Sequence, residues 1–243
     1  LGYSPERVNP GDKVHTIDKI DKVVSGQNKM VEKVLLEIYS KLTKGKVFLA
    51  KNIKVAEASK VIENSQRDIN IAFINEVAKI CNKLNISVYD VLNASSTKWN
   101  FLKFQPGLVG GHCIGVDPYY LAYKSSKLKI DPKVILSGRK TNNEMPTFIA
   151  KRIDEKLKRK SKVLFLGLTF KEDVPDLRNS KSFEIISFLK NKKHTIKLHD
   201  PYVKSDDLQL VNLKKIKNNS FDAFILAVPH KFYLQRMDFI KNF

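Results

Sequence analysis

"KVLFLGLTF", residues 162–170, is an apolar run with the length and composition of a buried strand. A helical pattern follows at residues 179–193, and two more strands are predicted at HTIKLHD (194–200) and FDAFILAV (221–228). Alternation of strands and helices at this spacing favours a parallel, doubly wound sheet. We therefore predict an α/β domain over residues 161–243.

A second α/β pattern stands at the amino-terminal end. DKVVS (21–25) predicts a short strand, residues 28–43 a helix, and KVFLA (46–50) another strand. We interpret this β-α-β fragment as the tail of an α/β domain, covering residues 1–53. The chain has no starting methionine and no Gly-x-Gly-x-x-Gly motif, so we expect most of that domain to be missing.

The middle of the chain, residues 54–160, predicts a helical domain. A helical pattern runs from Lys54 to Cys81, about seven turns. Helices of that length often span domains or pack against a partner subunit. Cys81 fits this pattern as a buried, small apolar residue. The apolar stripe of the helix consists of Val55, Ala58, Ile62, Ile69, Phe73, Val77 and Ile80.

The composition excludes several classes of protein. The net charge is +19, but the lysines are spread along the whole chain and only seven of the 44 basic residues are arginine. No nucleic-acid motif, membrane-spanning run or signal peptide is evident. We expect neither a nucleic-acid nor a membrane partner. Two cysteines are too few for a disulfide framework, so we expect a reducing, cytoplasmic location in which a thiol stays reactive.

The loop PGLVGGHCIGVDPYYL, residues 106–121, is dense in glycine and contains Cys113. Such density marks backbone that turns sharply or lies close to a ligand. Asp117 follows the cysteine by four residues. Because a nearby carboxylate raises the pKa of a thiol, Asp117 is better suited to managing water or a proton. The alternative is a structural turn around a buried cysteine.

Lys60 and Asn64 are four residues apart on the long predicted helix and therefore share one face. Such a pair is usually a solvated surface. Together with the loop, a cation and an amide donor could stabilise an oxyanion on a carbon attacked by Cys113. We expect no metal centre, because His112 beside Cys113 has no second ligand pair at suitable spacing.

The segment SPERVNPGD, residues 4–12, holds Glu6 in a proline-bounded turn. A glutamate held in this way could act as a base, or could cap the turn or pair with Arg7.

The segment GLTFKEDVPDLRNS, residues 167–180, brings Lys171 and Arg178 to the end of a predicted strand. Nucleotides bind at the carboxyl ends of strands in doubly wound sheets, and Lys with Arg suits phosphate. A charged surface loop is the alternative.

In their order and spacing, these motifs together resemble the UDP-glucose/GDP-mannose dehydrogenase family of nucleotide-sugar dehydrogenases. The resemblance covers essentially the whole chain. It implies an amino-terminal Rossmann domain that binds NAD, a long central helix that forms a homodimer, and a carboxy-terminal Rossmann-like domain that binds UDP. The motifs are SPERVNPGD, EASKVIENSQRDINIAFINE, GLVGGHCIGVDPYYL and GLTFKEDVPDLRNS.

The family's chemistry is the oxidation of a sugar's primary alcohol twice by NAD, through a thiohemiacetal and a thioester on cysteine. The resemblance makes Cys113 the nucleophile, and Lys60 and Asn64 the groups that stabilise the oxyanion and position water. It gives Asp117 a role in acid–base steps and Glu6 a role in hydrolysis.

The resemblance also assigns binding residues. Arg178 is similar to the family's contact to NAD phosphate. The implied UDP-sugar contacts are Gly107, Gly110, Gly111, His112 and Lys171.

Two departures from the family pattern bear on the substrate. Where UDP-glucose dehydrogenases carry a second Glu in the first motif, this chain has Pro10, and His112 replaces a small residue. The chain is similar instead to the branch that acts on UDP-N-acetylhexosamines in surface-polysaccharide synthesis. These residues do not distinguish UDP-N-acetylmannosamine from UDP-N-acetylglucosamine.

The alternatives are a UDP-glucose 6-dehydrogenase, a non-catalytic fragment that binds a UDP-sugar, and a basic nucleic-acid-binding module. The last explains the charge and none of the four motifs. We expect the isolated chain to have no dehydrogenase activity, because it lacks the phosphate-binding turn of an NAD domain.

Overall fold

The structure is a computed structural model that describes residues 1–204, 207–217 and 219–240. The chain forms two compact units. One consists of residues 1–67 and 117–131, and the other of residues 68–116 and 132–243. Among the helices within the described ranges, none combines the length and the apolar character needed to cross a membrane.

The first unit contains a small sheet and one covering helix. Strand β2 (Lys22–Gly26) leads through α1 (Lys29–Leu42) to β3 (Val47–Leu49), which pairs with β2 in parallel. This confirms the predicted β-α-β fragment. A two-residue strand, β1 (Gly2–Tyr3), adds to the other side of β2 in antiparallel orientation and was not predicted from the sequence.

The long helix predicted from Lys54 is α2 (Ile53–Lys83). Its apolar residues divide between two faces. The buried ones include Ala56, Ala72 and Ile74, whereas much of the predicted stripe is solvent-exposed. The exposed fractions are 45% for Val55, 54% for Ile62, 63% for Phe73 and 51% for Ile80.

Two further helices, not distinguished in the sequence, stand in the middle of the chain. Helix α3 (Val88–Ser95) begins at Ser87, whose hydroxyl accepts a hydrogen bond from the Asp90 amide. The first five residues of helix α4 (Asp117–Lys127) belong to the stretch that was predicted as the glycine loop.

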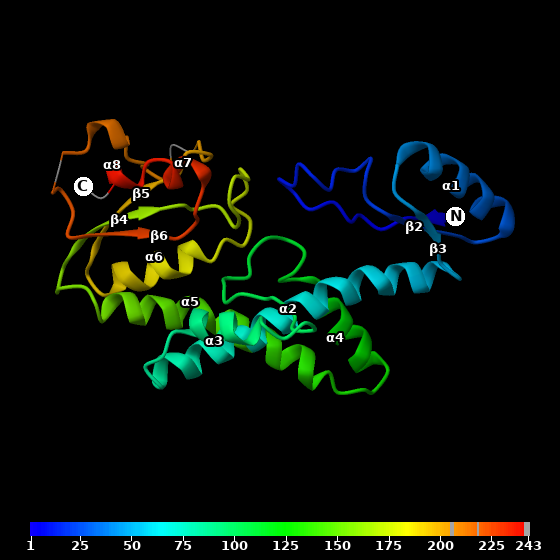
Figure 1. The fold of residues 1–243 in the computed structure, drawn as a ribbon, viewed down its shortest axis with the longest axis horizontal. Helices are drawn as coiled ribbons and strands as arrows, with labels where there is room; N and C mark the ends of the chain where they lie inside the picture. The colour runs from blue at the N-terminus through cyan, green and yellow to red at the C-terminus, as the bar shows by residue number, and fades with distance from the viewer. Residues whose placement is uncertain (205–206, 218, 241–243) are drawn as a thin grey trace. The chain divides into compact units, whose positions relative to one another are not determined.

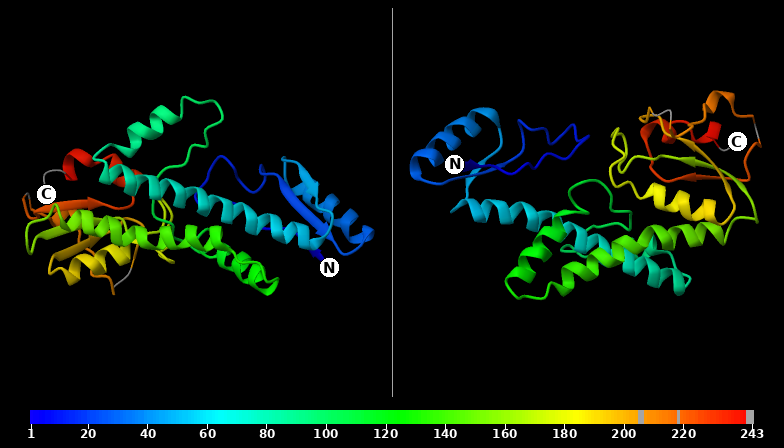
Figure 2. Two further views of the ribbon diagram at one scale, coloured as in Figure 1. Left: turned by 90° about the horizontal axis from the view of Figure 1, so that it is seen from below. Right: turned by 180° about the vertical axis from the view of Figure 1, so that it is seen from behind.

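In the second unit, the carboxy-terminal half of α2 packs beside α5 (Lys133–Asp154) (Figure 2). The helices approach closely at Gly138, where an added Cβ would lie 3.4 Å from Ile69 and 3.6 Å from Ala72. Cys81 on α2 is buried, as predicted, and both cysteines are free thiols.

The carboxy-terminal sheet contains β4 (Lys162–Leu166), β5 (Thr195–His199) and β6 (Ala223–Leu226) in the order β5-β4-β6, all parallel. Helix α6 (Ser182–Asn191) connects β4 to β5, and the chain then returns to the other side of β4. This is the predicted doubly wound arrangement. A short turn at Leu213–Lys215 precedes β6, and α7 (Lys231–Leu234) and α8 (Met237–Ile240) follow it.

The central strand β4 is buried on both faces. Val163 and Phe165 pack with α5 and α6, and Leu164 and Leu166 pack on the opposite face, where α7 and α8 lie (Figure 1). Burial on both faces explains why the strand reads as one continuous apolar run.

The strand ends at Leu166, earlier than predicted, because Gly167 has a φ of +91° that a sheet residue does not adopt. An added Cβ at Gly167 would lie 2.6 Å from the side chain of Val228. The segment from Gly167 to Lys181 is consequently a loop at the carboxyl end of β4. The proposed domain boundaries after residues 53 and 160 stay a prediction.

Candidate functional site

Cys113 lies in a tight turn of the second unit that begins at Gly111. The Val116 amide donates a hydrogen bond to the Cys113 carbonyl at 3.0 Å. The Cys113 side chain is half-buried, and its Sγ lies 3.9 Å from Nδ1 of the exposed His112. The thiol is therefore partly accessible to solvent on a turn that this backbone hydrogen bond closes.

Gly110 and Gly111 allow this turn to rest directly on the loop that follows β4. An added Cβ at Gly110 would lie 2.9 Å from the Asn179 carbonyl oxygen, and one at Gly111 would lie 3.0 Å from the Phe170 ring. Gly111 also has a φ of +78°. Its amide donates to the Arg178 carbonyl at 3.1 Å, and its carbonyl accepts from Asn179 Nδ2 at 3.0 Å. The glycine loop and the segment 167–180, which are separate motifs in the sequence, are thus hydrogen-bonded to each other.

Gly107 differs from these glycines, because an added Cβ would meet no atom within 4 Å. Its backbone is held by the buried side chain of Asn75 on α2. Asn75 Oδ1 accepts the Gly107 amide at 2.8 Å, and Asn75 Nδ2 donates to the Gly107 carbonyl at 2.9 Å. Asn75 was not predicted from the sequence. A sequence pattern that could have revealed it is the spacing of Asn64, Asp68 and Asn75 by four and seven residues. This spacing places three polar side chains on one helix face.

In the first unit, the structure brings Asn64 and Asp117 together. Asn64 on α2 is buried, and its Nδ2 donates to Asp117 Oδ2 at 2.5 Å. Asp117 is the first residue of α4. Lys60 lies one turn before Asn64 on α2 and is half-buried. An amide held against a carboxylate, with a lysine one turn earlier on the helix of the amide, suits the handling of a proton or a water molecule.

Glu6 is exposed and caps its own turn, since its Oε1 accepts the Val8 amide at 2.6 Å. Arg7 pairs instead with Glu63 of α2 at 2.9 Å and donates to the Asp21 carbonyl at 3.1 Å. Of the two structural alternatives for Glu6, the structure therefore shows the cap. Arg7 anchors the turn to the helix residue that precedes Asn64.

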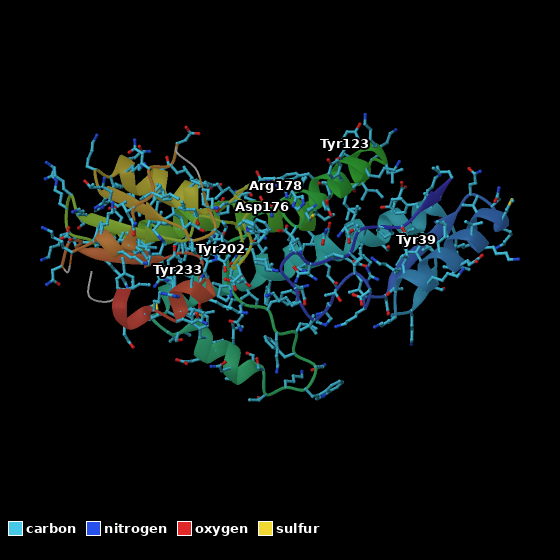
Figure 3. All side chains as sticks on the ribbon, turned by 90° about the horizontal axis from the view of Figure 1, so that it is seen from above. Tyr39, Tyr123, Asp176, Arg178, Tyr202 and Tyr233 are labelled. Carbon is cyan, nitrogen blue, oxygen red and sulfur yellow. The ribbon has the colours of Figure 1, made fainter. Side chains whose placement is uncertain are left out.

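Arg178 is exposed on the loop after β4 and forms a bidentate ion pair with Asp176, with contacts of 2.6–3.0 Å (Figure 3). Hydrogen bonding to Asp176 raises the pKa of Arg178, and the same contacts hold the pKa of Asp176 below its ordinary value. Lys171 lies on the same loop, where its carbonyl accepts the Thr169 hydroxyl at 2.9 Å. The exposed guanidinium fits an anionic ligand such as a diphosphate.

A buried Asp–His pair that was not predicted from the sequence fixes the same loop. Asp200 accepts the Leu168 amide at 2.6 Å and His230 Nε2 at 3.1 Å. His230 Nδ1 accepts the Asp173 amide at 2.9 Å, which leaves Nε2 to face Asp200. Burial opposes the ionisation of Asp200, but the hydrogen bonds outweigh it and lower its pKa. Asp200 and His230 thus hold the loop that carries Lys171 through the backbone amides of Leu168 and Asp173.

The predicted site residues therefore form two groups. Gly107, Gly110, Gly111, His112, Cys113, Lys171 and Arg178 belong to the second unit, and Glu6, Lys60, Asn64 and Asp117 belong to the first. Among the described residues, no three His, Cys, Asp or Glu side chains are grouped so as to hold a metal ion.

Parallel strand pairs with crossover helices at both ends of the chain, and a charged loop after a central strand, define an α/β protein of the Rossmann type. The chain belongs to the UDP-glucose/GDP-mannose dehydrogenase family. The family's central domain matches residues 54–144, and its UDP binding domain matches residues 164–242.

Curated relatives match nearly all of the chain. Protein CapL from Staphylococcus aureus is 48% identical over 99% of this chain, which covers 59% of CapL. UDP-N-acetyl-D-glucosamine 6-dehydrogenase from Salmonella typhi is 42% identical over 97% of this chain, which covers 58% of that enzyme. The chain thus spans less than two thirds of the length of these relatives.

Solved structures show the same fold. UDP-D-ManNAc dehydrogenase from Pyrococcus horikoshii superimposes with a TM-score of 0.83 at 28% identity, over 96% of this chain and 55% of that one. The UDP-N-acetyl-mannosamine dehydrogenase Cap5O from Staphylococcus aureus gives a TM-score of 0.80 at 33% identity, over 96% and 55% of the two chains.

Proposed function

We propose that the chain is the central and UDP-binding part of an NAD-dependent dehydrogenase that oxidises the primary alcohol of a UDP-N-acetylhexosamine to a carboxylate. The observation that carries this proposal is the position of Cys113. Its turn rests on the loop after β4 through two hydrogen bonds at Gly111, so a nucleotide sugar held by that loop would have its sugar close to the thiol. The names of the relatives and the residues Pro10 and His112 support the N-acetylhexosamine.

The overall reaction converts the alcohol and one water molecule into a carboxylic acid. Two molecules of NAD, bound one after the other, would each accept one hydride, the first from the alcohol carbon to leave the aldehyde and the second from the thiohemiacetal. Of the residues present, Arg178 fits the NAD phosphates, because the guanidinium is exposed and already holds an oxyanion, the Asp176 carboxylate. Most of the cofactor's contacts would come from an amino-terminal domain outside this chain.

Cys113 performs the covalent chemistry in this proposal. Its thiolate adds to the aldehyde carbon to give a thiohemiacetal, and loss of hydride gives a thioester that water then hydrolyses, releasing the thiol. Lys60 stabilises the oxyanion of the tetrahedral species. Asn64 orients Asp117, as their hydrogen bond supports, so that the carboxylate can accept a proton from the attacking water. Glu6 assists the same hydrolysis.

We also propose that the protein is a homodimer formed through α2. Four large apolar side chains of the predicted stripe, Val55, Ile62, Phe73 and Ile80, are exposed and are spaced by 7, 11 and 7 residues. This spacing places them on one side of the helix. Such a row is typical of a surface that a partner covers. A cytoplasmic location and a role in surface-polysaccharide synthesis complete the proposal, the former supported by the two free thiols.

The test is NADH formation by a protein that joins this chain to a complete cofactor domain. UDP-N-acetylglucosamine, UDP-N-acetylmannosamine and UDP-glucose are compared at equal concentrations. We expect kcat/KM to be higher for at least one N-acetylhexosamine than for UDP-glucose. A value for UDP-glucose equal to or above both others would contradict the substrate assignment, and no turnover of any of them would contradict the activity.

A further inference from the structure

A chain of buried polar side chains links α2, α5 and the glycine loop within the second unit. Asn75 donates to Asn142 Oδ1 at 2.8 Å, and Asn142 donates to Asp68 Oδ1 at 2.7 Å. Arg139 donates to the same Asp68 oxygen at 2.5 Å. Exposed fractions are 0% for Asp68 and Asn75, 1% for Asn142 and 3% for Arg139, so the whole network is removed from solvent.

Such a network is costly to bury. Burial raises the pKa of Asp68, although Arg139 and Asn142 act against that change. Two helices can pack with apolar residues alone, and replacing buried ion pairs by apolar residues is often neutral or stabilising. Packing of α2 against α5 therefore does not explain why these positions are polar.

The network is hydrogen-bonded to the glycine loop at Gly107 and lies close to it at Gly115. Asn75 makes both of its hydrogen bonds outside the helices to the backbone of Gly107. Further along the loop, an added Cβ at Gly115 would lie 3.9 Å from the guanidinium nitrogens of Arg139 and 3.8 Å from Val109. Gly107 and Gly115 flank Cys113 on either side.

We infer that this network positions the Cys113 turn, and that Asn75 is a positioning residue for the thiol. The inference deepens the function proposed above and rests on it. Asn75 holds the start of the glycine loop at Gly107, and the backbone of Arg178 and the side chain of Asn179 hold the loop at Gly111. Only three residues separate these two anchors, and Cys113 follows two residues later. Without Asn75 the segment before Cys113 loses its buried anchor.

The experiment compares Asn75→Ala with the parent in a full-length protein that carries a complete cofactor domain. Four quantities are measured: hydrogen exchange of the peptide that contains Gly107, the rate at which iodoacetamide alkylates Cys113, the steady-state constants, and the Kd for UDP. We expect faster exchange and faster alkylation, because the half-buried thiol becomes more accessible. We expect kcat to fall by about 10²-fold, since misplacement by about 1 Å has that effect, while the Kd for UDP stays within about threefold.

Asn75→Asp is the conservative variant. It keeps an acceptor for the Gly107 amide, but its buried carboxylate faces the Gly107 carbonyl and Asn142 Oδ1 where Asn75 donates, so the segment before Cys113 should be released at least as far as in Asn75→Ala. If Asn75→Ala does not fold, Asn75→Asp carries the test alone. Ile185→Val is the control, because it lowers the melting temperature through the core of the sheet without touching the network. It should leave the alkylation rate unchanged, with buried Cys81 as the internal reference.

Unchanged exchange at Gly107 and an unchanged alkylation rate at Cys113 in Asn75→Asp and in any folded Asn75→Ala would overturn the inference. These two measurements do not require turnover. If the parent protein oxidises no UDP-sugar, the proposed function fails, and exchange and alkylation still decide whether Asn75 positions the thiol.

Discussion

Lys60 is half-buried on α2, one turn before the buried Asn64 that binds Asp117. In the proposed mechanism its ammonium stabilises an oxyanion that exists only after the thiolate has added. We expect Lys60→Ala to lower kcat on the order of 10²–10³-fold, as the loss of an oxyanion-hole donor does. Lys54→Ala, an exposed lysine in the first turn of the same helix, is the matched control and should retain parental turnover. An equal loss in both variants would point to general charge effects.

Gly111 and Gly107 make a matched pair for testing the packing of the glycine loop. Gly111→Ala places a Cβ 3.0 Å from the Phe170 ring at a φ of +78°, so we expect about 1–3 kcal/mol lower stability. Gly107→Ala meets open space, and its stability should stay within about 1 kcal/mol of the parent. Urea unfolding measures both. If Gly107→Ala is the more destabilising of the two, Gly111 does not pack against Phe170 as described.

Single-residue roles were only partly predictable from the sequence. The density of glycine predicted a sharp turn or a close approach to a ligand, and the structure shows the turn. The close neighbour of Gly110 and Gly111 is a loop about 60–70 residues further along the chain, which no local pattern reveals. Asn75 and His230 act through buried side chains on distant backbone amides, so their sequence neighbourhoods carry little trace of the role.

Among the elements, β5 carries a titratable group that makes stability depend on pH. Burial is the main reason why the pKa of His199 is lowered from 6.5 to about 4. The native state therefore favours the neutral imidazole. The stability from this group is present above pH 6.5 and is lost as the pH falls from 6.5 towards 4. Because the ring is partly solvent-screened, we expect a contribution of about 1–2 kcal/mol.

The check is the urea midpoint at several pH values between neutral and mildly acidic. We expect the parent to lose stability on acidification more steeply than His199→Asn. His15→Asn is the control, because His15 is exposed and pairs only at the surface with Asp12. Identical pH profiles for the parent and His199→Asn would contradict the assignment of this group.

Strong apolar periodicity made most elements predictable. The β-α-β fragment, the long α2 and the β4-α6-β5 unit follow from short apolar runs for the strands and from a period of 3.6 for the helices. The elements that were not predicted, among them α4 and β1, have weaker sequence patterns. Helix α4 starts with Asp117-Pro118, a helix-start signal that stood inside a glycine-rich stretch, and β1 has only two residues whose pairing depends on Gly26 far along the chain.

For the whole molecule, the exposed apolar row on α2 predicts self-association. Phe73 is 63% exposed near the middle of this row, and Phe73→Glu places a charge in the proposed dimer interface. We expect the parent to sediment as a dimer and Phe73→Glu as a monomer at micromolar concentration. Met30→Glu, which adds the same charge at a 78% exposed position on α1, should remain a dimer. A monomeric parent would exclude the proposed interface.

The central claim is that Cys113 is a covalent nucleophile, and its direct test is the turnover of Cys113→Ser in the protein with a complete cofactor domain. UDP-sugar binding should persist, because the loop that carries Lys171 and Arg178 is intact. Turnover should fall by several orders of magnitude, since a hydroxyl is rarely ionised near neutral pH while a thiol partly is. Cys81→Ala, at the buried second cysteine, should retain turnover within a few-fold. Near-parental turnover in a well-folded Cys113→Ser protein would contradict the mechanism.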